Sequence, residues 1–162
     1  MNIRKPTDYT AMFAALDTLM AAQLPQMELY REIGRVVSGR SEKGAAVAAS
    51  EYLQAAYLAA EGFSPRNLRR MRAFYAAYEE SPEIMRLAMS LGWTQNVAIL
   101  EGCGSSEERA WYIRAVLHFG WKKAKLLAAI ESQAWLHSSL DEQAVSCYTG
   151  EKEATRESEC NE

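Results

Sequence analysis

Residues 62–78 read GFSPRNLRRMRAFYAAY, and they decide how the chain is interpreted. Gly62 can adopt a positive φ and end a preceding helix. Ser64 is a favoured N-cap, and Pro65 suits the first helical position because it has no N–H to leave unpaired. On a helical wheel one arc collects the large apolar side chains, which are Leu68, Met71, Phe74, Tyr75 and Tyr78. The stretch therefore predicts a helix from Pro65 to about Tyr78 with one face in the core.

The opposite arc of this predicted helix is basic. Its arginines are Arg66, Arg69, Arg70 and, at the border, Arg72, and no acidic residue occurs in residues 62–78. Arginine presents a planar donor fork that suits phosphate oxygens and guanine edges. We interpret this face, together with Asn67, as a nucleic-acid contact. The alternative is an ordinary solvated face whose arginines pair with acids on neighbouring helices.

The predicted helix before this one spans about residues 44–60, and residues 61–64 form a short link. Two helices joined in this way resemble a helix-turn-helix, whose second helix reads DNA from its N-terminal half. That half contains the first four candidates, Arg66, Asn67, Arg69 and Arg70. A second basic cluster, Lys122, Lys123 and Lys125, opens the last predicted helix, and we consider it a candidate to flank the same surface.

The rest of the chain up to residue 140 is also typical of helix. Alanine, leucine and methionine dominate, glycine falls at intervals, and runs of β-branched residues are missing. We predict one all-α, compact domain over residues 1–140, built of six or seven helices. Pro25 kinks the first helix or starts the second. Thr94, and Ser105 or Ser106, are expected caps of later helices.

Two further helices complete the predicted body. The helix that starts after Ser105 and ends at Gly120 is apolar nearly all round, and we expect it to be a central core helix. The last helix is predicted over about residues 122–136. On it, Trp135 lies off the apolar stripe, which favours a second-layer core position over a partner contact.

The acidity of the chain is concentrated at its C-terminal end. The formal net charge of the 162 residues is −3. Residues 141–162 hold seven acids (Asp141, Glu142, Glu151, Glu153, Glu157, Glu159 and Glu162) against Lys152 and Arg156. Residues 1–140 therefore hold 14 acids and 16 bases. We expect residues 141–162 to be a disordered tail, and we consider it a possible DNA mimic that guards the basic face.

No motif points to catalysis, a metal or a cofactor. The three cysteines, Cys103, Cys147 and Cys160, are far apart and form no CxxC, and the two histidines have no ligand-like spacing to them. Phosphate-binding glycine loops and nucleophile motifs are also missing from the sequence. We therefore expect a protein that is not an enzyme and has no catalytic residues, bound metal or cofactor.

The sequence also bears on location. No apolar run approaches the roughly 20 residues of a membrane span. The N-terminal stretch lacks the apolar core of a signal peptide. Unpaired cysteines fit a reducing compartment. We expect a soluble cytoplasmic protein that does not contact a membrane.

Four segments together carry a family resemblance. They are LYREIGRVVSGR (residues 29–40), GFSPRNLRRMRAFYAAY (62–78), LGWTQNVAILEG (91–102) and ERAWYIRAVLHFGW (108–121). In this order and spacing they resemble the N-terminal domain of the YhcG-type bacterial proteins. Those proteins are similar to PD-(D/E)XK nucleases and have a helical N-terminal domain followed by a nuclease domain. The resemblance covers about residues 29–136.

The resemblance implies a helical DNA-binding or interaction module that is not itself the catalyst. It places a recognition helix on Arg66, Asn67, Arg69 and Arg70. The chain ends after the short acidic segment, so we expect a stand-alone domain without the nuclease, such as an accessory of a mobile element. One departure is Lys122, which stands where the family usually has a serine after the Gly-Trp pair.

The function predicted from the sequence is a non-catalytic, DNA-binding accessory or regulatory domain. The alternative is a protein-interaction module, either a homodimer or a domain that docks on a nuclease or another partner. A more distant alternative is an inhibitor of a nucleic-acid enzyme. None of these functions involves a small-molecule cofactor.

Overall fold

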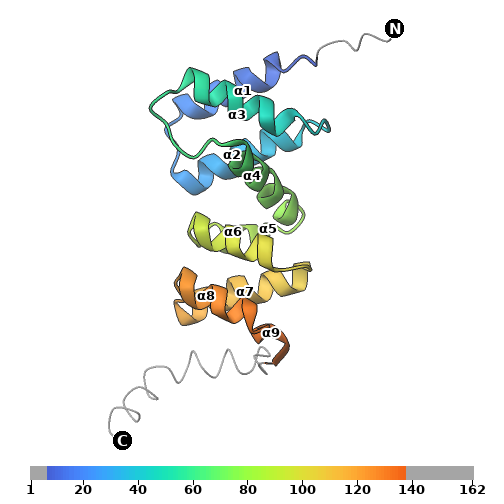
Figure 1. The fold of residues 1–162 in the computed structure, drawn as a ribbon, viewed down its shortest axis with the longest axis vertical. Coiled ribbons are helices and arrows are strands. Elements are labelled where there is room, and N and C mark those ends of the chain that lie inside the picture. The colour runs from blue at the N-terminus through green and yellow to red at the C-terminus, as the bar shows by residue number, and fades with distance from the viewer. Residues whose placement is uncertain (1–6, 138–162) are drawn as a thin grey trace, which may run out of the picture. The chain divides into compact units, whose positions relative to one another are not determined.

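A computed structural model describes residues 7–137 of the chain, and every regular element in this range is a helix (Figure 1). The helices are α1 (Thr10–Ala21), α2 (Gln26–Ser38), α3 (Ala45–Ala56), α4 (Pro65–Tyr78), α5 (Pro82–Ala88), α6 (Trp93–Gly102), α7 (Ser106–Phe119), α8 (Lys123–Glu131) and α9 (Ala134–His137). The predicted all-α class is confirmed. The tail predicted over residues 141–162 lies outside the described residues, as do Cys147 and Cys160.

Several helix ends differ from the predicted ones. Pro25 separates α1 from α2 as the N-cap of α2, so it starts a helix and does not kink one. The predicted helix over residues 44–60 ends at Ala56, because Tyr57 leaves the helical region with φ −128° and ψ 70°. The predicted helix over residues 122–136 is interrupted where Gln133 adopts φ 55°, and this divides it into α8 and α9.

The start of α6 also differs from the prediction. Its N-cap is Gly92, two residues before the expected cap Thr94. The backbone N–H of Gly92 donates to Oε1 of Gln95 at 2.9 Å. Gln95 in the first turn therefore accepts the N–H of the N-cap residue, which is a different bond from the side-chain cap expected of Thr94.

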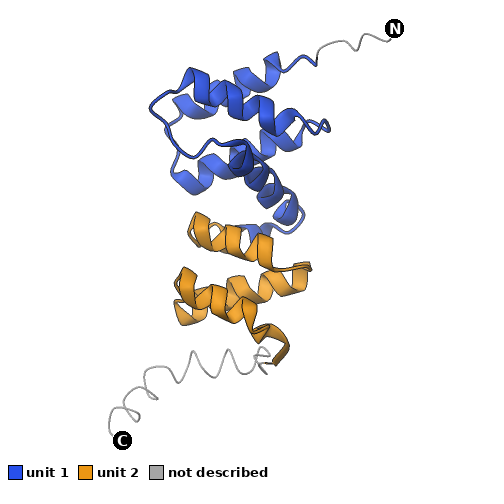
Figure 2. Cartoon of the chain, viewed as in Figure 1, with its two compact units in different colours: residues 1–85 blue, residues 86–162 orange. Residues whose placement is uncertain are grey.

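The chain divides into two compact units, residues 1–85 and residues 86–162 (Figure 2). Unit 1 contains α1 to α4, unit 2 contains α6 to α9, and the division falls within α5. No helix in the described part of the chain is long and apolar enough to cross a membrane.

The core of unit 1 is organised by a close crossing of α2 and α4. Gly34, in the middle of α2, is buried against the backbone of α4, and a Cβ there would collide with the carbonyl oxygen of Met71. The core that surrounds this crossing consists of Met12, Leu16, Tyr30, Ile33, Val37, Ala45, Ala46, Ala49, Leu53, Phe63, Leu68, Met71, Phe74 and Tyr78. Four of the five residues predicted for the buried face of α4 belong to it, whereas Tyr75 is only partly buried.

Asp17 connects α1 to α3. Its two carboxylate oxygens accept hydrogen bonds from the hydroxyls of Tyr52 and Tyr57, both at 2.6 Å. These bonds hold the pKa of Asp17 below its ordinary value, with Tyr52 the larger cause. They also raise the pKa of Tyr57 to about 12, because the hydroxyl proton is held by the carboxylate.

In unit 2, α6 packs against both α7 and α8, and α7 is not buried all round as predicted. Tyr112 and Ile113 are fully buried, whereas Leu117 is 42% exposed. Within unit 2, α6 and α9 pack against α7, and Leu117 lies on a side of α7 that stays exposed. The hydroxyl of Tyr112 donates to the Ala129 carbonyl of α8 at 3.3 Å and accepts from the backbone N–H of Trp135 at 3.5 Å.

Two other residues of unit 2 bear on the sequence predictions. Trp135 is partly buried, as its predicted second-layer position implies. Cys103 is a free, buried cysteine, and burial raises the pKa of its thiol to about 12. The thiol is therefore protonated near neutral pH, and it is a poor nucleophile in that form.

We expect Gly34→Ala to destabilise the protein by about 1–3 kcal/mol, because the methyl group forces apart the backbones of α2 and α4. The better helix propensity of alanine offsets only about 0.5–1 kcal/mol of that loss. Chemical denaturation measures the difference. Gly44→Ala is the control, because a Cβ there meets only the Tyr9 hydroxyl at an ordinary 3.5 Å. Equal stabilities of the two variants would contradict the close crossing.

We expect Asp17→Asn to lower Tm at pH 7 and to have little effect at strongly acidic pH. Since the pKa of Asp17 is lowered in the folded state, its stabilisation is present above the unfolded pKa and is lost as pH falls through the folded pKa. Thermal unfolding from pH 7 to about pH 3 measures the difference in Tm between the variant and wild type. Glu51→Gln, on the exposed side of α3, is the control. A gap that stays constant to low pH would contradict the prediction.

Candidate nucleic-acid interface

The residues before α4 form a tightly fixed joint. Gly62 has φ 92°, and a Cβ at this position would collide with the Tyr30 hydroxyl, so only glycine fits. Phe63 is buried, and its carbonyl oxygen accepts hydrogen bonds from Oγ of Ser50 at 2.6 Å and Nε2 of Gln54 at 2.8 Å. The joint is longer than a helix-turn-helix turn, since it runs from Tyr57 to Ser64.

The start of α4 is capped as the sequence predicts, and Asn67 takes part in it. Oγ of Ser64 accepts the backbone N–H of Asn67 at 3.2 Å, and Pro65 occupies the first turn. The side-chain amide of Asn67 donates back to the Gly62 carbonyl at 2.6 Å. Asn67 therefore positions this loop, and the Gly62 carbonyl already occupies one N–H of its amide.

The solvent-facing stripe of α4 is arginine-rich at one end and smooth at the other. Its exposed residues follow helical spacing in the order Arg66, Arg69, Ala73 and Ala76. Arg70 and Arg72 are only partly exposed. The wheel thus placed the first two arginines correctly on the exposed face.

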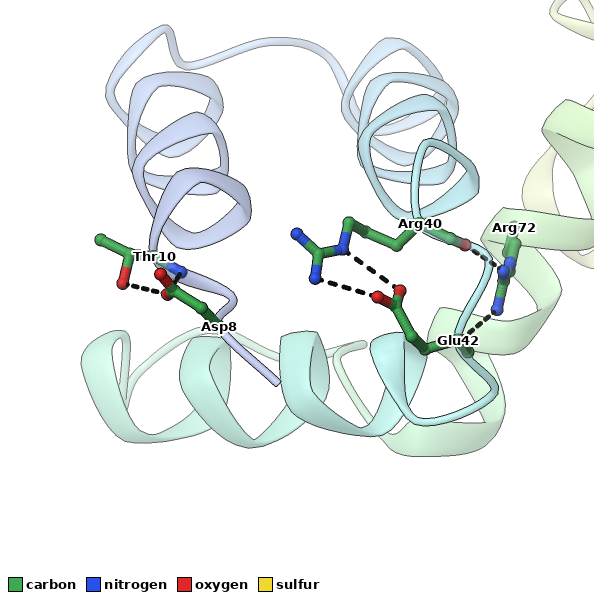
Figure 3. A network of polar contacts seen from close by, with 5 residues as sticks. All are labelled: Asp8, Thr10, Arg40, Glu42 and Arg72. Carbon is green, nitrogen blue, oxygen red and sulfur yellow. Dashed lines mark hydrogen bonds and ion pairs between the residues drawn. The ribbon is translucent and has the colours of Figure 1, made fainter. Parts of the chain in front are cut away.

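Arg72 holds the loop between α2 and α3 (Figure 3). Its guanidinium donates to the carbonyl oxygen of Glu42 at 3.3 Å and to that of Arg40. One side chain of α4 therefore donates hydrogen bonds to two backbone carbonyls of this loop. We assign Arg72 a structural role, which sequence reasoning missed; its position at the border of the basic arc is the one signal that distinguishes it.

The same loop carries its own ion pair. Nη2 and Nε of Arg40 lie 3.1 Å and 3.2 Å from the two carboxylate oxygens of Glu42 (Figure 3). The Arg40 guanidinium also lies 4.9 Å from the centre of the Tyr9 ring. Hydrogen bonding from Arg40 is the main cause that lowers the pKa of Glu42. In this loop, the charges of Arg40 and Glu42 are therefore paired with each other.

The arginines of unit 1 differ in their partners. On α2, both Arg31 and Arg35 pair with Glu32, at 3.2 Å and 3.0 Å. By contrast, the guanidinium groups of Arg66 and Arg69 make no hydrogen bond or ion pair with any residue in the described range 7–137. The first turn of α4 contains no acid either. Two uncompensated charges therefore sit in the N-terminal half of the helix, where the macrodipole is already positive.

The second predicted basic cluster lies in unit 2. Lys122 is the N-cap of α8 and makes no capping bond, because an ammonium group cannot accept one. Lys122, Lys123 and Lys125 are all exposed, and the first turn of α8 contains no acid. Like α4, α8 therefore begins with exposed basic residues and has no acid in its first turn, but it belongs to the other unit.

These features define the class of the protein: a helical domain of two compact units, with uncompensated basic residues at the starts of two helices. The chain belongs to the family described as the DUF1016 N-terminal domain, whose model matches residues 14–137. The match confirms the resemblance to the N-terminal domain of the YhcG-type proteins, and it includes residues of both units. No curated protein and no solved structure matches the chain.

We expect Arg72→Ala to lower stability by about 1–3 kcal/mol, because two backbone carbonyls lose a charged donor. Arg69→Ala is the matched control on the same helix, and we expect a change of at most about 0.5 kcal/mol. Chemical denaturation of both variants gives the comparison. If Arg69→Ala is the more damaging change, the division between a structural and an available arginine is wrong.

Proposed function

We propose that the protein binds DNA through the exposed stripe of α4, with Arg66 and Arg69 as the principal phosphate contacts. The observation that carries this proposal is that neither guanidinium has a hydrogen-bond or ion-pair partner among residues 7–137, in the N-terminal half of a helix whose first turn contains no acid. The other arginines of the unit whose contacts are described, Arg31, Arg35, Arg40 and Arg72, each have one. A phosphate would supply the missing counter-charge.

The energetics favour a ligand over a merely solvated face. Arg66, in the first turn of α4, opposes the macrodipole by about 0.3–1 kcal/mol, whereas α7 has Glu107 and Glu108 in its first turn. A bound anion reverses the sign of this interaction. Beyond the arginines, the exposed side chains are the small ones of Ala73 and Ala76, so a duplex can approach the helix closely.

The remaining predicted residues take supporting parts in this proposal. Arg70 lies beside the exposed stripe and is partly buried. Asn67 and Arg72 fix the position of α4 through backbone carbonyls. Binding involves no chemical step, and we propose that it takes place in the cytoplasm, where bacterial DNA lies.

The test is binding of the full chain to a labelled duplex of mixed sequence at about 50 and 200 mM salt. We expect Arg66→Ala combined with Arg69→Ala to reduce the salt slope by about two, since each phosphate contact contributes roughly one unit. We also expect the melting temperature of this double variant to stay close to that of wild type.

Arg31→Ala combined with Arg35→Ala is the matched control. It removes the same two positive charges from a neighbouring helix, where both are paired with Glu32. Non-specific attraction would weaken equally in the two double variants. The proposal fails if both lose the same affinity, or if neither wild type nor variant binds the duplex at low salt.

A second candidate function is the protein-interaction module. It is favoured by three exposed leucines of unit 2, Leu117, Leu127 and Leu136, at 42%, 45% and 60% exposure. Apolar side chains of this size at the surface are typical of partner contacts when they form one patch. Sedimentation at high salt separates the two functions, because apolar association survives salt and phosphate binding does not.

A further inference from the structure

A second basic segment, in unit 2, combines positive charge with aromatic rings. Residues 109–130 contain no acid and five bases, which are Arg109, Arg114, Lys122, Lys123 and Lys125. The same stretch holds four aromatic residues: Trp111, Tyr112, Phe119 and Trp121. It forms most of α7, the turn at Gly120 and most of α8. The end of α7 and the start of α8 therefore lie next to each other, and the charged residues of this stretch are all basic.

Three of the rings form a cluster of ring–ring contacts, here called the aromatic shelf: Trp111, Phe119 and Trp121. Phe119 and Trp121 are stacked, with centroids 5.3 Å apart and planes 21° apart. Trp111 lies 6.4 Å from Trp121 at an angle of 55°. All three rings are partly exposed, whereas Tyr112 is buried in the core and does not belong to the shelf.

The backbone at the centre of the shelf is fixed. The carbonyl oxygen of Trp121 accepts a hydrogen bond from Nε2 of Gln95 at 2.6 Å. Gly120 ends α7 in the left-handed region with φ 65°, which turns the chain toward α8. The backbone of Trp121 is therefore fixed by a hydrogen bond and by the turn at Gly120.

Exposed bases border the shelf on both helices. Lys122 and Lys123 follow Trp121 directly, and Arg114 lies one helical turn after Trp111 on α7. None of these three side chains makes a hydrogen bond or ion pair with another residue of the described part of the chain. The shelf thus has uncompensated positive charge at its edges.

We propose that the aromatic shelf and its bordering bases bind single-stranded nucleic acid. Unpaired bases stack on the exposed rings, and the lysines at the start of α8 hold the phosphates of the same strand. Stacking of bases on aromatic rings within a positive surface is the general mode of single-strand binding. This site lies on unit 2 and is independent of the proposed duplex contact of α4.

The observations favour a single strand over the two other occupants. A duplex hides the faces of its bases, so it cannot use the rings. The dry centre of a protein interface is depleted of lysine, yet here two lysines follow the central ring directly. A flexible strand satisfies both the rings and the charges.

The experiment measures anisotropy of a labelled oligo-dT of about 15 nucleotides with the full chain, against a hairpin duplex as competitor. We expect Trp121→Ala to weaken binding roughly five- to a hundredfold through lost stacking, and Trp121→Phe to retain most of the affinity. We expect Lys122→Ala combined with Lys123→Ala to reduce the salt slope by about 1.4, the value for two single-strand phosphates. Thermal unfolding of each variant verifies the fold.

Arg66→Ala combined with Arg69→Ala is the control, because it alters the duplex site and leaves the shelf intact. Unchanged oligo-dT binding by this variant supports a separate site, even if no duplex binding exists. The proposal is overturned if the hairpin competes as well as unlabelled oligo-dT, or if the lysine variant keeps the wild-type slope. It is also overturned if oligo-dT does not bind while Trp121→Ala abolishes a salt-resistant self-association, since the shelf is then a protein interface.

Discussion

The close crossing of α2 and α4 governs unit 1, because the two backbones approach each other where Gly34 has no side chain. With Met71 pressed against that glycine, α4 has only one rotation about its axis that buries Leu68 and Phe74. The same rotation turns Arg66 and Arg69 to solvent. A core contact on one side of a helix thereby decides which charges its other side presents.

The arginines of unit 1 show how one residue type serves two purposes. Arg40 and Arg72 close the loop between α2 and α3, one through a carboxylate and the other through backbone carbonyls. Their charges are used within the fold. Arg66 and Arg69 add nothing to the fold that the structure describes, and they oppose the dipole of their own helix. Under the proposed function, a phosphate supplies the counter-charge that these two arginines lack among the described residues.

Unit 2 also has a helix, α8, that begins with exposed basic residues. At the start of α8, a lysine stands at the cap where no side-chain bond is made, and further lysines follow in the first turn. The partly exposed rings beside them give this surface a chemistry that α4 lacks. Two basic surfaces, one with alanines and one with aromatic rings, suit two forms of nucleic acid, and separate variants address each one.

The sequence by itself determined the helical class, the Ser64–Pro65 start of α4 and its buried face, because capping and periodicity act within a few neighbouring residues. It did not reveal that Asn67 and Arg72 are held by backbone carbonyls, since those partners are contributed by the joint before α4 and by a distant loop. The ring cluster around Trp121 was missed because the wheel of one helix does not show how the turn at Gly120 places Trp121 against Trp111 and Phe119. Only the tertiary structure decided which polar groups are already paired, because pairing depends on segments that folding brings together.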